Sequence, residues 1–186
     1  MLFSPKPCRS CVSGRGPREC LMHDRLSRRQ ILTAKLRALP AVLRPPWTGD
    51  DFEARCNACG ECIQACPRQV LRVDAQNYPF VDYSNTGCDF CGECAKSCDT
   101  GAIRERATPW DVEVKILAGC LAVQGTVCRS CEEICEEEAV SFRLGLNGKS
   151  CPVINAQACS GCGFCVAPCP TRAITIQAKQ MEEIHA

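Results

Sequence analysis

The chain has 186 residues, of which 20 are cysteine and only 5% are aromatic. So few large apolar side chains give a thin hydrophobic core, and we expect inorganic centres to supply part of the stability. Abundant cysteine is also typical of secreted disulfide scaffolds. The regular three-residue steps between cysteines argue against that class, because metal–sulfur cages need such spacing and disulfide frameworks do not.

The net charge of +1 hides an uneven distribution of charge along the chain. Residues 1–44 hold ten basic and two acidic residues, whereas residues 45–186 hold twelve basic and nineteen acidic ones. This asymmetry suggests a basic arm that binds nucleic acid or a partner protein. We expect a protein partner and no nucleic acid, because no aromatic residues alternate with the basic ones to stack on bases.

The first 23 residues are predicted to be a disordered lead, since they are rich in Gly, Pro, Ser and Arg. They also contain Cys8, Cys11, Cys20 and His23, which have zinc-like ligand chemistry, so metal binding there stays open. Met22 is a possible natural start of the protein. In that case the three early cysteines have no functional role.

Residues 24–47 are predicted to form a basic helix and a proline-rich connector. Apolar residues recur at mostly helical spacing from Leu26 to Leu39, and Pro40 ends the pattern. The helix either packs on the body of the protein or docks to a partner, with Arg28 and Arg29 as candidate partner-binding residues.

Residues 27–32 (SRRQIL) resemble the twin-arginine export motif. Lys35, Arg37 and Pro40 interrupt the uncharged stretch that should follow it. The longest apolar run, Ile116 to Val123, is far too short to span a membrane. We therefore expect a protein that is not exported, has no membrane span and works in the reducing cytoplasm.

Sixteen cysteines form four runs that repeat along the body of the chain. The first run, from Cys56 to Pro67, has the spacing of the bacterial ferredoxin sequence that binds a 4Fe-4S cluster. The second and fourth runs keep this spacing, and in the third run the first gap grows from two residues to seven. The candidate iron ligands are Cys56, Cys59, Cys62 and Cys66; Cys88, Cys91, Cys94 and Cys98; Cys120, Cys128, Cys131 and Cys135; and Cys159, Cys162, Cys165 and Cys169.

Short strand-like segments separate the runs. They lie at residues 70–73 and 78–81, at 139–142 and 151–154, and after the second and fourth runs at 102–103 and 173–176. The pattern predicts an α+β fold of two tandem dicluster (bacterial 2x4Fe-4S) ferredoxin-like modules with short hairpins and short helices that carry the fourth cysteines. We place the modules at residues 48–108 and 109–178, followed by a tail at 179–186.

In dicluster modules the fourth cysteine of one run binds the cluster of the other run. We therefore expect Cys98 to complete the first set of three and Cys66 the second, with Cys169 and Cys135 crossing in the same way. This gives four expected 4Fe-4S clusters, three of them on runs that keep the spacing. The cluster of the third run is either 4Fe-4S or 3Fe-4S.

Three features beside the runs depart from the simple pattern. Asp99 and Glu136 follow fourth cysteines where the other runs have proline, which weakens the redirection of the chain. Five glutamates between residues 132 and 138 either lower the reduction potential of a nearby cluster or form a solvated surface. Cys151, outside the runs, is predicted to be a buried, unligated thiol rather than a redox switch.

The order of these motifs resembles the NapF ferredoxin-type proteins of the periplasmic nitrate reductase system. The resemblance rests on residues 27–32, on Arg44-Pro45-Pro46-Trp47 and on the four runs, and it covers residues 24–178. It implies a cytoplasmic accessory protein whose sixteen cysteines bind 4Fe-4S clusters and which helps the precursor of the molybdenum-containing catalytic subunit to mature before export.

The chain shows no nucleophile and base pair and no flavin or nicotinamide fingerprint, so we do not expect an enzyme. The alternative to an accessory protein is a plain electron carrier that serves a nitrate reductase or a related oxidoreductase. Both functions use the same cluster ligands, and the cysteines alone do not separate them.

Overall fold

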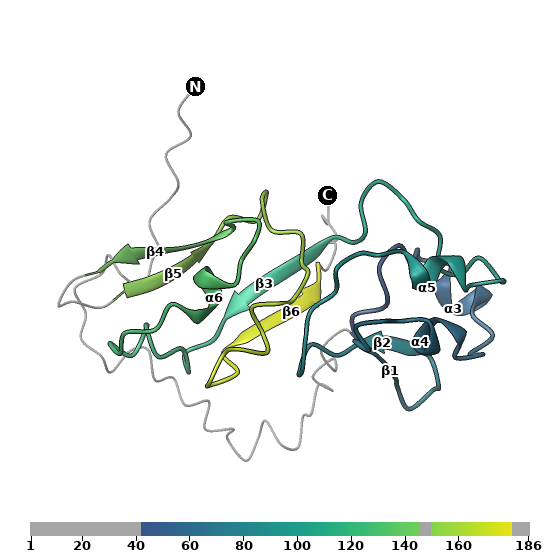
Figure 1. Ribbon diagram of the computed structural model, residues 1–186, viewed down its shortest axis with the longest axis horizontal. Coiled ribbons are helices and arrows are strands. Elements are labelled where there is room, and N and C mark those ends of the chain that lie inside the picture. The colour runs from purple at the N-terminus through teal and green to yellow at the C-terminus, as the bar shows by residue number, and fades with distance from the viewer. Residues whose placement is uncertain (1–41, 146–149, 180–186) are drawn as a thin grey trace, which may run out of the picture.

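The computed structural model describes residues 42–145 and 150–179. The predicted lead, the basic helix with Arg28 and Arg29, and all of the predicted tail except Lys179 lie outside the described residues. The first two cysteine runs and the last two form separate halves that lie end to end along the long axis (Figure 1). Within the described ranges, no helix has the length and apolar character that a membrane span requires.

The elements of both halves are short. The helices are α3 (Phe52–Arg55), α4 (Glu61–Gln64), α5 (Glu93–Lys96) and α6 (Ser130–Glu133). The strands are β1 (Leu71–Val73), β2 (Pro79–Val81), β3 (Val112–Ile116), β4 (Val140–Leu144), β5 (Ser150–Ile154) and β6 (Ile174–Ala178). The fold is therefore a small mixed one, in which loops make up most of the described chain.

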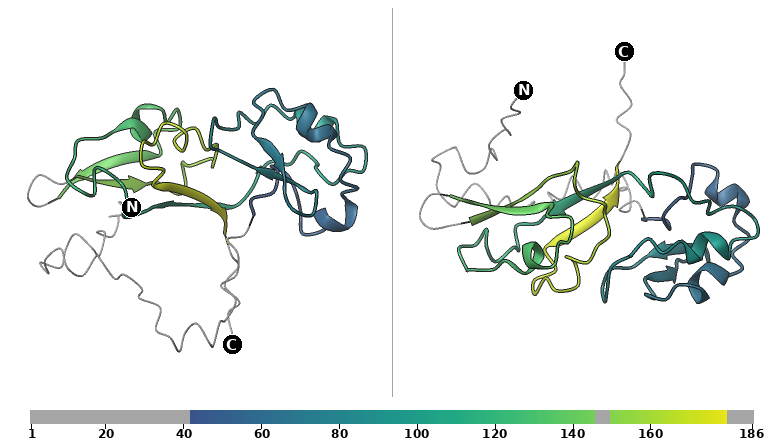
Figure 2. Two further views of the ribbon diagram at one scale, coloured as in Figure 1. Left: turned by 90° about the horizontal axis from the view of Figure 1, so that it is seen from below. Right: turned by 45° about the horizontal axis from the view of Figure 1, so that its top comes forward.

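The strands pair as three antiparallel two-stranded sheets, β1–β2, β3–β6 and β4–β5. The hairpins β1–β2 and β4–β5 each connect two cysteine runs. Strands β3 and β6, at the start and the end of the second half, lie side by side (Figure 2). In the first half a single bridge between Thr48 and Ile103 has the position of the β3–β6 pairing. The two halves thus repeat one plan.

The same two positions after every run are buried. The residues four and five places after each fourth cysteine are at most 6% exposed. These residues are Val70 and Leu71, Ala102 and Ile103, Ala139 and Val140, and Ala173 and Ile174. Each pair begins a strand or a bridge directly after a cysteine loop, so it fixes the loop to the core.

Two expectations from the sequence are wrong. The short helices carry the third cysteine of a run, at Cys62, Cys94 and Cys131, and the fourth cysteine follows beyond the helix end. The fourth run forms turns at this place. Cys151 is half-buried on β5 opposite Arg143, and not buried as expected.

The two halves meet at the loop of the fourth run. The hydroxyl of the buried Tyr83 donates a hydrogen bond to the carbonyl of Gly161 at 2.8 Å. The indole N–H of Trp110 donates to the carbonyl of Ser160 at 3.1 Å. A side chain from each side of the boundary between the halves therefore holds this loop by its backbone.

Two equivalent glycines differ in their surroundings. Gly60 and Gly163 each follow the second cysteine of a run, and their φ angles are +81° and +80°. A Cβ atom on Gly163 would overlap the ring of Tyr83, whereas one on Gly60 would meet nothing within 4 Å. Backbone conformation alone explains Gly60, but Gly163 is also required by the contact between the halves.

We expect Gly163→Ala to lower the thermal midpoint more than Gly60→Ala does. Both variants force alanine into a left-handed conformation, which costs about 1–2 kcal/mol. Only Gly163→Ala must also displace a buried ring, which costs about 1–3 kcal/mol more. Circular dichroism of the cluster-loaded proteins, heated at one fixed rate, measures both midpoints. Equal midpoints would contradict the close packing at Tyr83.

Candidate iron-sulfur sites

Three of the four runs share one backbone conformation. A residue with positive φ precedes the second cysteine and another follows it, and these residues are Ala58 and Gly60, Phe90 and Gly92, and Gly161 and Gly163. Left-handed residues on both sides of one cysteine curl the run into a tight loop, so its first three thiols face a common centre. Ala58 and Phe90 adopt this conformation without being glycine, a local strain that is concentrated at functional sites.

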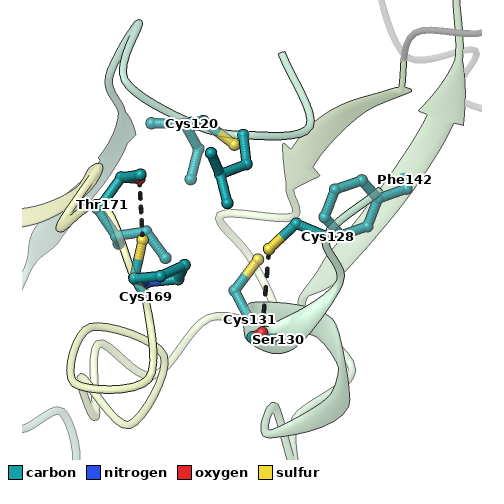
Figure 3. A pocket seen from close by; sticks show the side chains of 11 residues that line it. Cys120, Cys128, Ser130, Cys131, Phe142, Cys169 and Thr171 are labelled. Carbon is teal, nitrogen blue, oxygen red and sulfur yellow. Dashed lines mark hydrogen bonds between the residues drawn. The ribbon is translucent and has the colours of Figure 1, made fainter. Parts of the chain in front are cut away.

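The third run reaches a similar result through its enlarged loop. The N–H of Thr126 donates to the carbonyl of Leu121 at 2.9 Å, so the extra residues close on themselves. Cys120 consequently lies near the rest of its run, despite the seven-residue gap. Figure 3 shows a pocket lined by the thiols of Cys120, Cys128, Cys131 and Cys169.

The chain turns in the same way after every fourth cysteine. The residue three positions later has a positive φ and donates its N–H to the carbonyl of that cysteine at 3.1 Å; these residues are Gln69, Gly101, Glu138 and Arg172. The turn forms with Asp99 and with Glu136 as well as with proline. The expected weakening of the redirection at these two residues is therefore not observed.

Three of the fourth cysteines also accept hydrogen bonds at sulfur. Backbone N–H groups lie 3.3 or 3.4 Å from the Sγ atoms, in the pairs Ile103 with Cys98, Ala139 with Cys135, and Ala173 with Cys169. Such bonds favour the thiolate over the thiol and are one of the factors that set the reduction potential of a cluster.

In the first half, each set of three thiols gathers with a cysteine of the other run. Burial, together with the charges of Cys56, Cys59 and Cys98, raises the pKa of the Cys62 thiol to about 11. Cys98 of the second run therefore lies with the first set. Conversely, Cys66 of the first run lines a pocket with Cys88, Cys91 and Cys94.

The second half crosses in the same way. Burial and the charges of Cys120, Cys128 and Cys169 raise the pKa of Cys131 to about 11. Burial also raises the pKa of Cys165 to about 12, with contributions from the charges of Cys159, Cys162 and Cys135. The structure thus brings together all sixteen candidate cysteines in four sets of four.

These sets fit a multi-iron centre better than a single ion. In residues 42–145 and 150–179, no three His, Cys, Asp or Glu side chains lie close enough to hold one metal ion. A tetrahedral zinc site, with Zn–S bonds of about 2.3 Å, would hold its sulfurs about 3.8 Å apart. Thiols that raise one another's pKa need a positive centre to be thiolates together, which a bound multi-iron centre would supply across this wider spacing.

The glutamates of the third run lie mostly in solvent. Glu133, Glu136, Glu137 and Glu138 are exposed, and Glu132 forms an ion pair with Arg129 at 2.6 Å. The charge of Glu137 contributes, after burial, to a raised pKa of Cys159. Glu137 is therefore the acidic residue of this surface whose charge acts on a thiol of the fourth run.

Sequence reasoning missed a pair of hydroxyl groups beside the fourth cysteines. The Oγ1 atoms of Thr100 and Thr171 lie 3.5 and 3.8 Å from the Sγ atoms of Cys98 and Cys169. Both threonines follow a fourth cysteine by two residues, a repeat that is visible in the sequence. Tyr83 was missed too, because its contact with Gly161 has no local sequence signal.

Comparison with known protein families finds two iron-sulfur domains in the chain. The model of a 4Fe-4S dicluster domain matches residues 55–103, and that of a 4Fe-4S binding domain matches residues 152–175. The first match spans both runs of the first half and the second match spans the fourth run. Binding of 4Fe-4S clusters is thereby established for this chain.

Several curated proteins resemble the chain over most of its length. The ferredoxin-type protein NapF of Escherichia coli strain K12 is 42% identical over 154 residues, which cover 81% of this chain and 94% of the relative. NapF of Haemophilus influenzae is 36% identical over 173 residues, 86% of this chain and 98% of the relative. The methylamine utilization ferredoxin-type protein MauM of Methylophilus methylotrophus is 30% identical over 160 residues, 75% of this chain and 71% of the relative. The resemblance seen in the sequence is confirmed, and the chain belongs to the NapF family of ferredoxin-type proteins.

Proposed function

We propose that this chain is an iron-sulfur accessory protein of the periplasmic nitrate reductase system. It binds the cytoplasmic precursor of the molybdenum-containing catalytic subunit and assists its maturation before export, by supplying electrons or supporting cluster insertion. The observation that carries the proposal is the 42% identity to a NapF protein over 94% of that relative's length. The maturation role is what the resemblance to this family implies.

The sixteen gathered cysteines bind four clusters in crossed sets, within modules at residues 48–108 and 109–178. The first set is Cys56, Cys59, Cys62 and Cys98; the second is Cys88, Cys91, Cys94 and Cys66; the third is Cys120, Cys128, Cys131 and Cys169; and the fourth is Cys159, Cys162, Cys165 and Cys135. Each bound cluster supplies one-electron redox chemistry. The second set and the third set, with its enlarged loop, each line a pocket, which supports this assignment.

The protein residues hold and shield these centres. The third cysteines of the first three runs are buried, so one side of each of these sets is closed to water. Cys59 and Cys91, the second cysteines of the first two runs, are exposed. A partner that docks on the first half would approach these two sulfurs directly.

The charge distribution supports docking by the N-terminal segment. Residues 1–44 carry a net charge of about +8, opposite in sign to the rest of the chain. Arg28 and Arg29 are the candidate contacts with the precursor, because a guanidinium forms strong, directional bonds with carboxylates.

A plain electron carrier is the second candidate function. The exposed sulfurs of Cys59 and Cys91 favour it, because electron exchange with a reductase needs a centre near the surface. Both functions use the same cluster ligands. They differ in the defect expected when this protein is missing: an accessory protein leaves the catalytic subunit immature, whereas an electron carrier leaves it without electrons.

We expect Cys56→Ser to lower the iron content from about sixteen atoms per chain to about twelve, because a 4Fe-4S cluster needs all four thiolates. The first half should also lose stability, since metal binding and folding are coupled in small metal modules. Iron and sulfide analysis measures the loss. Cys151→Ser is the matched control and should keep full iron, and unchanged iron in Cys56→Ser would refute the ligand assignment.

We expect cells that lack this protein to have low nitrate reductase activity even with an artificial electron donor. A donor that bypasses the natural chain reports whether the catalytic subunit was matured, because it replaces any electron carrier. Normal activity with the artificial donor, combined with loss of activity with the physiological donor, would instead identify an electron carrier.

Replacement of both Arg28 and Arg29 by alanine should weaken binding of the catalytic precursor about tenfold, the effect of losing roughly 1.4 kcal/mol of charge-assisted contact. Isothermal titration of purified precursor into the loaded protein measures the change. The variant with Arg15 and Arg18 replaced by alanine removes the same charge from the lead, and equal weakening in both would show that only net charge matters.

A further inference from the structure

The contact between the two halves joins two cysteine sets directly. The backbone N–H of Cys88, in the second run, donates a hydrogen bond to the carbonyl of Cys162, in the fourth run, at 2.7 Å. The path from one Sγ atom to the other therefore consists of the covalent bonds of these two residues and a single hydrogen bond. Two candidate ligand residues are thus connected without any intervening side chain.

Tyr83 lies between the same two sets. Its buried ring belongs to the same core cluster as Cys88 of the second set. On the other side, a Cβ atom on Gly163, the residue after Cys162, would overlap the ring. One buried ring thus packs against both halves. Its hydroxyl is held by the carbonyl of Gly161 at 2.8 Å.

The contact is packed too tightly to admit even a methyl group. A Cβ atom on Gly87, the residue before Cys88, would lie 2.6 Å from both the Cγ and the backbone N of Phe164, and 2.7 Å from the carbonyl O of Cys162. The guanidinium of Arg68 covers the Phe164 ring at 5.5 Å and pairs with Asp89 at 3.0 Å. This close packing fixes the spacing of the second and fourth sets.

The remaining sets adjoin these two within each half. Helix α4, which carries Cys62 of the first set, packs against helix α5, which carries Cys94 of the second set. Cys131 of the third set and Cys165 of the fourth set pack in one core cluster. In space the four sets therefore follow the order first, second, fourth, third.

We propose that the two halves form one electron-transfer series and that electrons cross between them at the contact of Cys88 with Cys162. Gly87 and Tyr83 are positioning residues for this crossing. The inference deepens the proposed function and rests on its ligand sets, but not on the nitrate reductase partner. In each crossing one electron leaves the centre of one half and reduces the centre of the other, and no bond or proton is transferred.

The test compares Gly87→Ala with Gly119→Ala in the loaded, full-length protein. Both glycines directly precede the first cysteine of a run, but a Cβ on Gly119 would meet only the Cβ of Ala173, at an ordinary 3.9 Å. A light flash in the presence of a photoreductant delivers less than one electron per chain, and freeze-quench electron paramagnetic resonance follows the redistribution of that electron. Iron and sulfide contents are measured first, so a failure of the ligand assignment is seen separately.

We expect wild type and Gly119→Ala to relax quickly to one final spectrum. Gly87→Ala, with full iron content, should lose the fast phase and keep electrons in the half that was reduced first. Relaxation of Gly87→Ala at the wild-type rate would overturn the proposal, and so would equal slowing in Gly119→Ala.

If Gly87→Ala does not fold or does not load its clusters, the same relaxation measurement on Tyr83→Phe tests the proposal. This variant keeps the ring and removes only the hydrogen bond to Gly161, so the fold is retained while the loop at Cys162 loses the bond that holds it against Cys88. Slower relaxation with full iron content would support the crossing at this contact. An unchanged rate would refute it.

Discussion

Thiolates gathered in one small space repel one another, and the rest of this structure is arranged around that constraint. The buried third cysteines, such as Cys62 and Cys131, have raised pKa values because burial and their neighbours disfavour the charged form. Iron bound at the centre of a set would remove this penalty by supplying positive charge. The left-handed residues, the one-turn helices and the buried pairs after each run all serve to bring the thiols to that centre. The low content of large apolar residues is then understandable, because the inorganic centres replace part of the core.

One loop design serves two purposes in this chain. In the first run a Cβ atom on Gly60 would meet nothing within 4 Å, and the loop converges three thiols without a contact to the other half at this glycine. In the fourth run the equivalent loop also forms the contact surface between the halves, with Tyr83 and Gly87 packed against it. The cysteine loop of the fourth run thus has a second role that the loop of the first run does not have. This role comes from the residues that pack against the loop, because the cysteine spacing of the two runs is the same.

The sequence predicted those features that depend on local spacing. The four runs and the hairpins between them follow from neighbouring residues, whereas the sequence left open whether the acidic segment is a solvated surface. The strand β3 was not predicted, although Val112 to Ile116 alternates apolar and charged residues, because its partner β6 lies far along the chain. The helix position was predicted wrongly, since cysteine spacing fixes where sulfurs converge but not which cysteine is helical. The contact of Tyr83 with Gly161 joins residues 78 positions apart, and no local pattern reports it.

The crossed gathering of the cysteines has a consequence for biosynthesis. Every set in the first half is complete once Cys98 has left the ribosome, so this half can fold and load early. The second half has no complete set until its last run is synthesised, because Cys120 and its neighbours wait for Cys169. During translation the surface around Tyr83 and Gly87 remains bare until the fourth run arrives to cover it. Because of this order of synthesis, the second half folds last and packs against a first half that is already complete.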